Sequence, residues 1–201
     1  MALVALDPGH GKLTKGKRSP SSMGSPQVRE YLFNRQLAKE TLKALERCGI
    51  DTILTVADDS DPSLTARARY AKNRGCKLFI SLHANAGGGT GMEAFHMEGC
   101  DKCYRLARLV LTECTTATKS RSRGLKTKIT VYTNGVARLV DSGVLAKAHA
   151  AGMAATLFEA AFMDHPKDIL RLRDPAFRIT VAEAICKAVC KYLGVEYHER
   201  K

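Results

Sequence analysis

The chain has 201 residues, of which 45% are hydrophobic, so it is long enough for one domain with a sizeable core and too apolar to be disordered as a whole. It carries 32 Lys and Arg residues against 20 Asp and Glu residues, and the formal charge of +12 favours an anionic partner, with nucleic acid as one candidate. No apolar run approaches the roughly 20 residues that a membrane span needs, which argues against a transmembrane helix.

The N-terminal residues, MALVALDPGHGK, are unlike a secretory signal, because Asp7 interrupts the apolar run too early. We therefore expect a protein that is synthesised in the cytoplasm without a signal peptide. Its seven cysteines are an odd number for a disulfide scaffold and are expected to be free thiols.

The first half of the chain alternates apolar strands with helices. The apolar run at 2–6 predicts a strand, which Pro8 and two nearby glycines are expected to end. A polar loop rich in Ser, Pro, Gly and Lys follows at 13–29. The remaining elements predicted in this half are a helix at 30–49, a strand at 50–56, a helix at 63–75 with Ser63 as its cap, and strands at 77–82 and 91–97.

The second half begins with a predicted helix at 101–118. The segment 119–152 is basic at its start and hard to assign, although Asn134-Gly135 is a turn signal. Two further elements are predicted near the end of the chain, a strand at 153–159 that ends in an acid and a helix at 174–194 that starts with a proline.

Strands that alternate with helices indicate an α/β fold, here a mostly parallel twisted sheet flanked by helices on both faces in a single domain. We expect residues 1–195 to form this domain and residues 196–201 to be a frayed C-terminal tail.

Ionisable side chains follow several of the predicted strands. In an open parallel sheet, ligands bind beyond the carboxyl ends of the strands. His10, His83 and Glu159 each fall at such an end, and Glu30 opens the first long helix on the same edge. Two imidazoles and one carboxylate are a known ligand set of zinc hydrolases, with a fourth position left open. A second carboxylate outside the ligand set can then move protons.

Each of these residues also has a plain structural explanation when it is taken singly. A histidine at a strand end is often a hydrogen-bonded structural residue, and an acid in the first turn of a helix, such as Glu30, is favoured by the helix dipole. Glu159 differs, because an acid directly after a buried strand is partly desolvated and its pKa can be raised.

Several ordered stretches carry a resemblance to a known family. They are LDPGHG, REYLFN, SLTARARYAKNRGCKLFISLHANA, RGLK and ATLFEAAFMDHPKDILRLRDPAFR. Together they resemble the zinc-dependent N-acetylmuramoyl-L-alanine amidases of the Amidase_3 type, which occur in bacterial autolysins and phage endolysins. The resemblance runs nearly end to end, from Leu3 to Leu193. The stretch KLTKGKRSPSSMGSPQV is longer than its counterpart in the family, and the segment from Thr127 to Ala148 is expanded.

The resemblance implies one catalytic zinc held by His10, Glu30 and His83, with Glu159 as the catalytic acid and base. It implies hydrolysis of the amide between N-acetylmuramic acid and L-alanine in peptidoglycan. A phage endolysin or a bacterial autolysin would act on the cell wall after release. The basic surface would then attract anionic cell-wall polymers.

Two other functions are open to a chain of this composition. The charge and the run KSRSRGLKTK would suit a nucleic-acid-binding module. However, the sequence predicts neither a sheet surface lined with aromatic side chains nor a recognition helix, so no nucleic-acid partner is expected. A zinc peptidase that acts on free peptides is the other alternative.

The remaining histidines and cysteines carry weaker signals. His96, His149 and His165 lack a partner motif and are expected to be structural, and Cys186 and Cys190 are expected in the core. The pair Cys100-x-x-Cys103 opens a predicted helix, where it could be a redox switch or, on the simpler interpretation, two ordinary thiols.

Overall fold

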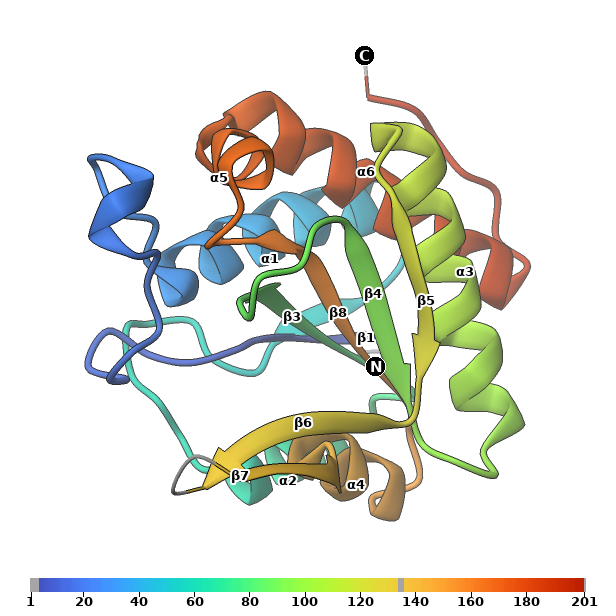
Figure 1. Ribbon diagram of the computed structural model, residues 1–201. Helices are drawn as coiled ribbons and strands as arrows, with labels where there is room; N and C mark the ends of the chain where they lie inside the picture. Colours follow the sequence, from blue (N-terminus) through green and yellow to red (C-terminus); the bar gives the residue numbers. More distant parts are fainter. Residues whose placement is uncertain (1–3, 134–135, 201) are drawn as a thin grey trace.

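The computed structural model describes residues 4–133 and 136–200. Its centre is a six-stranded sheet in the order β2-β1-β3-β8-β4-β5 (Figure 1). The strands of this sheet are β1 (Val4–Pro8), β2 (Thr52–Leu54), β3 (Leu78–Asn85), β4 (Met92–His96), β5 (Ser122–Lys126) and β8 (Ala154–Phe162). β2, β1, β3 and β8 run parallel to one another, whereas β4 is antiparallel to β8 and β5 is parallel to β4. The sheet is therefore mostly parallel, as predicted.

Helices cover both faces of this sheet, which confirms the predicted single-domain α/β fold (Figure 1). The larger layer contains α1 (Glu30–Arg47), α3 (Asp101–Thr118) and α6 (Pro175–Leu193), and the smaller layer contains α2 (Leu64–Asn73) and α4 (Gly143–Ala150). A 3-10 turn at Ser21–Met23 and the short helix α5 (Pro166–Arg173) complete the helices of the described residues.

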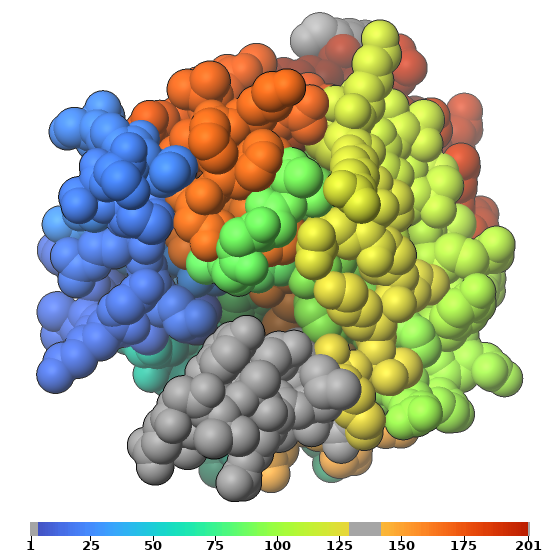
Figure 2. Space-filling view, in the orientation of Figure 1, coloured from blue at the N-terminus to red at the C-terminus, as the bar shows by residue number. Residues whose placement is uncertain are grey.

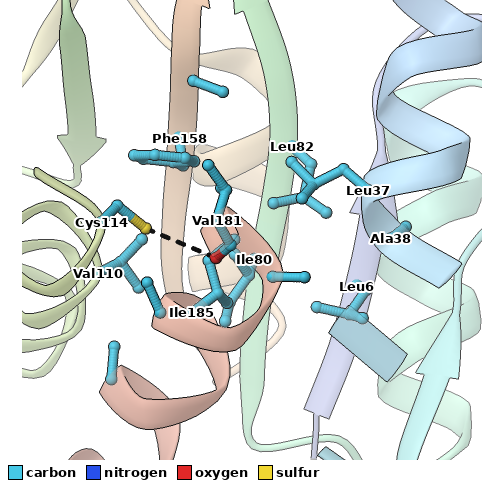
Figure 3. Close-up of a cluster of buried hydrophobic side chains, with 14 of the residues drawn as sticks. Leu6, Leu37, Ala38, Ile80, Leu82, Val110, Cys114, Phe158, Val181 and Ile185 are labelled. Atoms are coloured by element: carbon cyan, nitrogen blue, oxygen red, sulfur yellow. Dashed lines mark hydrogen bonds between the residues drawn. The ribbon is translucent and has the colours of Figure 1, made fainter. Parts of the chain in front are cut away.

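Two apolar clusters hold these layers together. Successive residues of a strand point to opposite faces of its sheet, so β3 contributes Ile80 to the cluster beneath the larger layer and Phe79 to the cluster beneath the smaller one. Figure 3 shows Ile80 in the larger cluster, together with Phe158 of β8, Leu37 of α1 and Val181 of α6. Both helical layers are thus fixed to the same central strands.

β1 continues to Pro8, although this proline was predicted to end the strand earlier. The N–H of Val4 donates toward β2, and the N–H of Gly9 donates to the carbonyl of Leu82 in β3. Because N–H groups alternate in direction along a strand, the nitrogen of Pro8 faces the β2 side. The register of β1 with β2 ends at Leu6, so Pro8 occupies a place where no donor is needed.

The caps of the helices follow the sequence in several places. Ser63 accepts a hydrogen bond from the N–H of Ala66 at the start of α2, as predicted. Asp174 accepts from the N–H of Ala176 and is followed by a proline at the first position of α6. Sequence patterning missed α5, a helix of eight residues.

The segment 119–152 forms β5, a two-stranded antiparallel sheet of β6 (Lys128–Thr133) and β7 (Val136–Asp141), and then α4. Thr133 pairs with Val136 in the register of this ribbon. The turn predicted at Asn134-Gly135 lies outside the described residues.

The C-terminal tail has no regular secondary structure, yet it is held against the domain, so the expectation of a frayed end is wrong for the described residues. The hydroxyl of Tyr197 donates to Glu183 at 2.8 Å, and Arg47 donates to the carbonyl of His198 at 2.9 Å.

The expectation of seven free thiols is also wrong for one pair. Cys100 and Cys103 form a disulfide, and their Cα atoms are 5.2 Å apart, a distance that a disulfide spans. Cysteine spacing alone does not reveal the backbone geometry that decides this. The other five cysteines are free and buried, and they include Cys186 and Cys190 in the core, as predicted.

Membrane insertion gains no support from the helices. None of those in the described part of the chain combines the length and the apolar character that crossing a bilayer demands.

Candidate metal centre

Three predicted ligands meet at the carboxyl edge of the parallel strands. His10 follows β1, Glu30 is the first residue of α1, and His83 lies near the end of β3. One ligand atom from each of the three side chains lies within 4.8 Å of the other two. Glu30 Oε1 is 3.3 Å from His10 Nε2 and 2.9 Å from His83 Nδ1. Residues separated by up to 73 positions in the chain therefore share one small volume, since 83 − 10 = 73.

The Glu30 carboxylate is buried between the two imidazoles, with an exposed fraction of 2%. Burial acts to raise the pKa of Glu30, but the hydrogen bonds to His10 and His83 outweigh it and hold the pKa below its ordinary value. Burial acts to lower the pKa of His83, but the hydrogen bond to Glu30 and the charges of the neighbouring carboxylates outweigh this effect. The pKa of His83 is therefore raised above its ordinary value. The cluster is a negative charge packed against two nitrogen bases, which is the donor set of a zinc site.

Gly9 sets the position of the His83 ring. A Cβ on Gly9 would lie 2.1 Å from His83 Cε1 and 2.4 Å from Nε2, far inside van der Waals contact. Any other residue at position 9 would displace this ring. The glycine of the DPGHG motif therefore serves the imidazole contributed by β3.

The backbone at His10 is unusual, with a φ of 61° in the left-handed region that side chains other than glycine rarely adopt. The surroundings hold it there. Arg35 donates to the carbonyls of Pro8 at 2.6 Å and His10 at 2.8 Å, and Asn34 donates to the carbonyl of Gly9 at 3.1 Å. Strain of this kind persists where neighbouring contacts over-determine the conformation, and it is frequent at functional sites.

A buried polar chain supports His83 from below. His83 Nε2 lies 3.2 Å from Ser81 Oγ, and this hydroxyl donates to Asp7 Oδ2 at 2.7 Å. The guanidinium of Arg67, itself 2% exposed, pairs with Asp7 Oδ1 at 2.9 Å. These contacts orient the imidazole, as outer-shell partners of metal ligands do.

Glu159 lies beside this cluster on β8, where it is the Cα partner of His83 in the strand register. Its Oε2 atom is buried and has no hydrogen-bond partner in the described structure. Burial raises the pKa of Glu159 to about 8, against the opposing charge of His83. A carboxyl group in this state can release and regain a proton near neutral pH. The expected desolvation of this acid agrees with the geometry, but the predicted strand end does not, because β8 continues through Glu159 to Phe162.

Glu93 is a further buried acid near the centre, and sequence reasoning assigned it no role. It is the Cα partner of Glu159 on the other side of β8. It accepts hydrogen bonds from Asn85 at 2.7 Å, Arg123 at 2.7 Å and Lys126 at 2.6 Å. Two of these donors come from the RGLK stretch. The signal that could have revealed Glu93 is an acid in the middle of the apolar strand GMEAFHM.

The glycine run after β3 forms an anchored rim of the site. The N–H groups of Gly87 and Gly88 both donate to Asp164 Oδ2, at 2.7 and 2.8 Å. A Cβ on Gly89 would lie 2.5 Å from the ring of Phe162. Figure 2 looks onto this side of the molecule, where the green loop before β4 lies between the blue N-terminal segment and the yellow segment around β5. The rim is therefore bare of side chains and also fixed in place.

The other histidines lie away from the centre. His165 accepts from the N–H of Asp168 at the start of α5, which is a structural role as predicted. His96 Nδ1 lies 3.0 Å from the carbonyl of Met97, and His149 lies 3.8 Å from Cys103 Sγ.

A mixed α/β sheet carries two imidazoles and a buried carboxylate at its carboxyl edge, and the unpartnered Oε2 atom of Glu159 lies beside them. This layout is typical of metal-dependent hydrolases. The family model for Amidase_3, N-acetylmuramoyl-L-alanine amidase, matches residues 4–191. The chain belongs to the Amidase_3 family.

Relatives and solved structures agree with this assignment. The chain is 28% identical over 183 residues to N-acetylmuramoyl-L-alanine amidase CwlM of Bacillus licheniformis, in an alignment that covers 90% of this chain and 65% of CwlM. The chain thus spans less than two thirds of the length of this relative.

Among solved structures, the catalytic domain of the amidase CwlV from Bacillus (Paenibacillus) polymyxa has a TM-score of 0.80 at 26% identity, covering 98% of this chain and 100% of the other. An N-acetylmuramoyl-L-alanine amidase from Clostridium difficile 630 has a TM-score of 0.81 at 27% identity, covering 96% of this chain and 97% of the other.

Proposed function

We propose that this protein is a zinc-dependent hydrolase of peptidoglycan, which cleaves the amide bond between N-acetylmuramic acid and L-alanine. The observation that carries the proposal is the meeting of His10, Glu30 and His83 within 4.8 Å, beside Glu159, whose Oε2 atom is buried and has no hydrogen-bond partner in the described structure. Membership of the Amidase_3 family supports the choice of bond.

The residues present fit a zinc ion. Two nitrogen donors and one carboxylate oxygen are a common protein ligand set of catalytic zinc, and they leave a coordination position for water or substrate. A zinc ion bound there would polarise the scissile carbonyl and lower the pKa of water. We assign the role of holding the ion to His10, Glu30 and His83.

The chain's own contribution to proton transfer comes from Glu159. With a pKa raised by burial to about 8, its carboxylate can take a proton from the attacking water and then deliver it to the nitrogen of the leaving L-alanine. Both transfers need the carboxyl group to be free of competing partners, and Oε2 has none in the described structure. The bare rim at Gly87 and Gly88 leaves space for a glycan strand to approach.

The proposed place of action is the cell wall, reached after synthesis in the cytoplasm, as for a phage endolysin or a bacterial autolysin. Fractionation of expressing cells before and after lysis tests this part, with the protein expected in the soluble fraction first and on the wall afterwards. Protein found on the walls of intact cells before lysis would rule out the endolysin route and favour an exported autolysin.

The decisive experiment uses purified cell walls. The metal-loaded protein is expected to reduce turbidity and to release stem peptides with a free L-alanine amino terminus, as read by mass spectrometry. Removal of zinc by a chelator is expected to abolish release, and added zinc to restore it. We expect Glu159→Gln to keep one zinc per chain and to lose at least about a hundredfold in rate, the range typical of a lost general acid and base.

The matched control is Glu46→Gln, an exposed acid on α1, which should retain full activity. An active Glu159→Gln protein would remove the role assigned to this residue. Cleavage of free synthetic peptides with intact walls untouched would instead favour a zinc peptidase.

A further inference from the structure

Of the two clusters of metal-ligating side chains that the described residues form outside the proposed catalytic centre, one combines sulfur with nitrogen. It consists of Cys100, Cys103 and His149, whose ligand atoms lie within 4.8 Å of one another. Cys100 is the N-cap of α3, Cys103 lies in its first turn, and His149 comes from α4. The proposed function makes no use of this cluster.

The cluster is at the opposite edge of the sheet from the catalytic centre. β4 is antiparallel to β8, so its first residues lie near Glu159, whereas its last residue, His96, pairs with Thr156 toward the amino end of β8. Cys100 follows β4 closely, and the start of α3 and α4 both lie at this end of the sheet (Figure 1). A ligand bound here would be distinct from one bound by His10, Glu30 and His83.

The two helices are held in fixed relation at this point. His149 Nδ1 lies 3.8 Å from Cys103 Sγ, and Lys102 donates to the carbonyl of Gly152, just after α4, at 2.9 Å. The cysteines are 7% and 0% exposed, and His149 is half-buried, so an ion could reach the cluster from the side of the imidazole.

The structure shows the two cysteines joined as a disulfide, in which neither sulfur is a thiolate. We propose that reduction of this disulfide creates a second zinc site, with Cys100, Cys103 and His149 as its three protein ligands. Tetrahedral zinc, with Zn–S near 2.3 Å and Zn–N near 2.0 Å, requires sulfur and nitrogen ligands about 3.5 Å apart. The observed separation of Cys103 Sγ from His149 Nδ1 is close to this value.

The chemistry balances with an external dithiol as reductant. The dithiol gives two electrons and two protons to the disulfide, the Cys100–Cys103 bond breaks, and the dithiol becomes a disulfide. Zinc binding then displaces the two thiol protons, while His149 binds as the neutral imidazole. The N–H of Cys103, which donates to Cys100 Sγ at 3.3 Å, would continue to stabilise the sulfur as a thiolate. The oxidised and the metal-bound states exclude each other.

The test compares the metal content of the oxidised and the dithiol-reduced protein after desalting without oxygen. We expect the reduced protein to bind one more zinc per chain than the oxidised protein. Cobalt in place of zinc should give a thiolate-to-metal charge-transfer band that increases on reduction, because neither the proposed catalytic centre nor the free thiols of Cys48, Cys186 and Cys190 gain a ligand when the disulfide is reduced. This difference between redox states does not depend on whether the protein cleaves peptidoglycan.

Two variants and a control assign the ligands. Cys100→Ser and His149→Ala should each weaken the extra site at least tenfold, and His149→Ala should leave the disulfide able to form. Cys76→Ser changes another buried thiol outside the cluster and should retain the extra zinc. Equal zinc in both redox states, an extra zinc that survives both variants, or a disulfide that the dithiol cannot reduce in the folded protein would each overturn the proposal.

Discussion

Gly9 and His83 show how a residue without a side chain can determine the position of a candidate ligand. The ring of His83 occupies the space that a Cβ at position 9 would need. The contact between the buried Glu30 carboxylate and this ring therefore depends on the absence of a Cβ at Gly9, directly after β1. Small residues next to a metal ligand are therefore part of its support.

We expect Gly9→Ala to weaken zinc binding about 10- to 100-fold, as loss of an outer-shell contact does, because the His83 ring must move away from Glu30. Titration with a zinc-sensitive chelator would measure this change. Gly143→Ala is the matched control, since its Cβ would meet only the flexible end of Leu64 at 2.9 Å. Unchanged affinity in Gly9→Ala would contradict the role given to the contact.

Arg35 is a second single residue on which the site depends. Its guanidinium donates to the carbonyls of Pro8, His10, Asp58 and Ser60, at distances from 2.6 to 3.0 Å. A planar fork of donors can reach four acceptors in different directions, whereas an ammonium group cannot. This residue therefore joins the strained backbone at His10 to the loop before α2.

Arg35→Lys is expected to lower the free energy of unfolding by about 2–4 kcal/mol, because several buried carbonyls lose their donor. Urea denaturation would measure the change. Arg69→Lys, at an exposed position of α2, serves as the control and should differ from the wild type by less than about 0.5 kcal/mol. A stable Arg35→Lys protein with an unchanged metal affinity would show that the four hydrogen bonds of the Arg35 guanidinium are dispensable.

Glu93 connects two strands that are far apart in the sequence. It lies on β4 and accepts from Arg123 and Lys126 on β5, so ion pairs between a buried acid and two half-buried cations reinforce the edge of the sheet next to Glu159. Burial acts to raise the pKa of Glu93, and hydrogen bonds from the two cations outweigh this and lower the pKa from its ordinary value of 4.5. The ionised form is thus favoured by folding.

The sign of the pH dependence follows from this shift. The contribution of Glu93 to stability is present above pH 4.5 and is lost as the pH falls through the lowered pKa of the folded state. Glu93→Gln should therefore destabilise the protein by about 1–3 kcal/mol at neutral pH and by much less in strong acid. Denaturation at several pH values measures this, with Glu46→Gln as the exposed control. An equal destabilisation at all pH values would count against the ion pair.

Elements were predictable where the local pattern was strong. The helix at 101–118 was predicted with its observed bounds, because its apolar spacing is regular. β3 was predicted to end at Leu82, yet it continues to Asn85. Residues such as His83 extend this strand because β8 pairs with them, and such pairing is invisible to a local pattern.

The formal charge of +12 is a property of the whole chain and not of one site. We propose that it attracts the chain to anionic wall polymers. Raising the salt concentration from about 50 mM to about 500 mM should weaken wall binding at least about tenfold, because exposed charges are screened. Co-sedimentation with purified walls would measure this, while zinc content should stay constant. Binding that does not change with salt would contradict the electrostatic attraction.

The sequence by itself determined the class of fold, and it predicted the edge of the sheet where the candidate site lies and the four side chains proposed for it. The prediction rested on hydrophobic periodicity, on the positions of His10, His83 and Glu159 after apolar strands and on Glu30 at the start of a helix, because parallel strands bring their carboxyl ends to one edge. The family resemblance added the division of roles between Glu30 and Glu159.

Only the tertiary structure decided how these side chains are held. The unpartnered Oε2 of Glu159, the clash that reserves Gly9 for His83 and the pairing of Cys100 with Cys103 all arise from atoms brought together by the packing of different elements. The burial of a side chain and its distance from another side chain depend on residues that are distant in the sequence, so a local sequence pattern does not reveal them. A pattern of residue types can therefore identify candidate ligands, but it does not give the distances between their ligand atoms, which decide whether they can bind one ion.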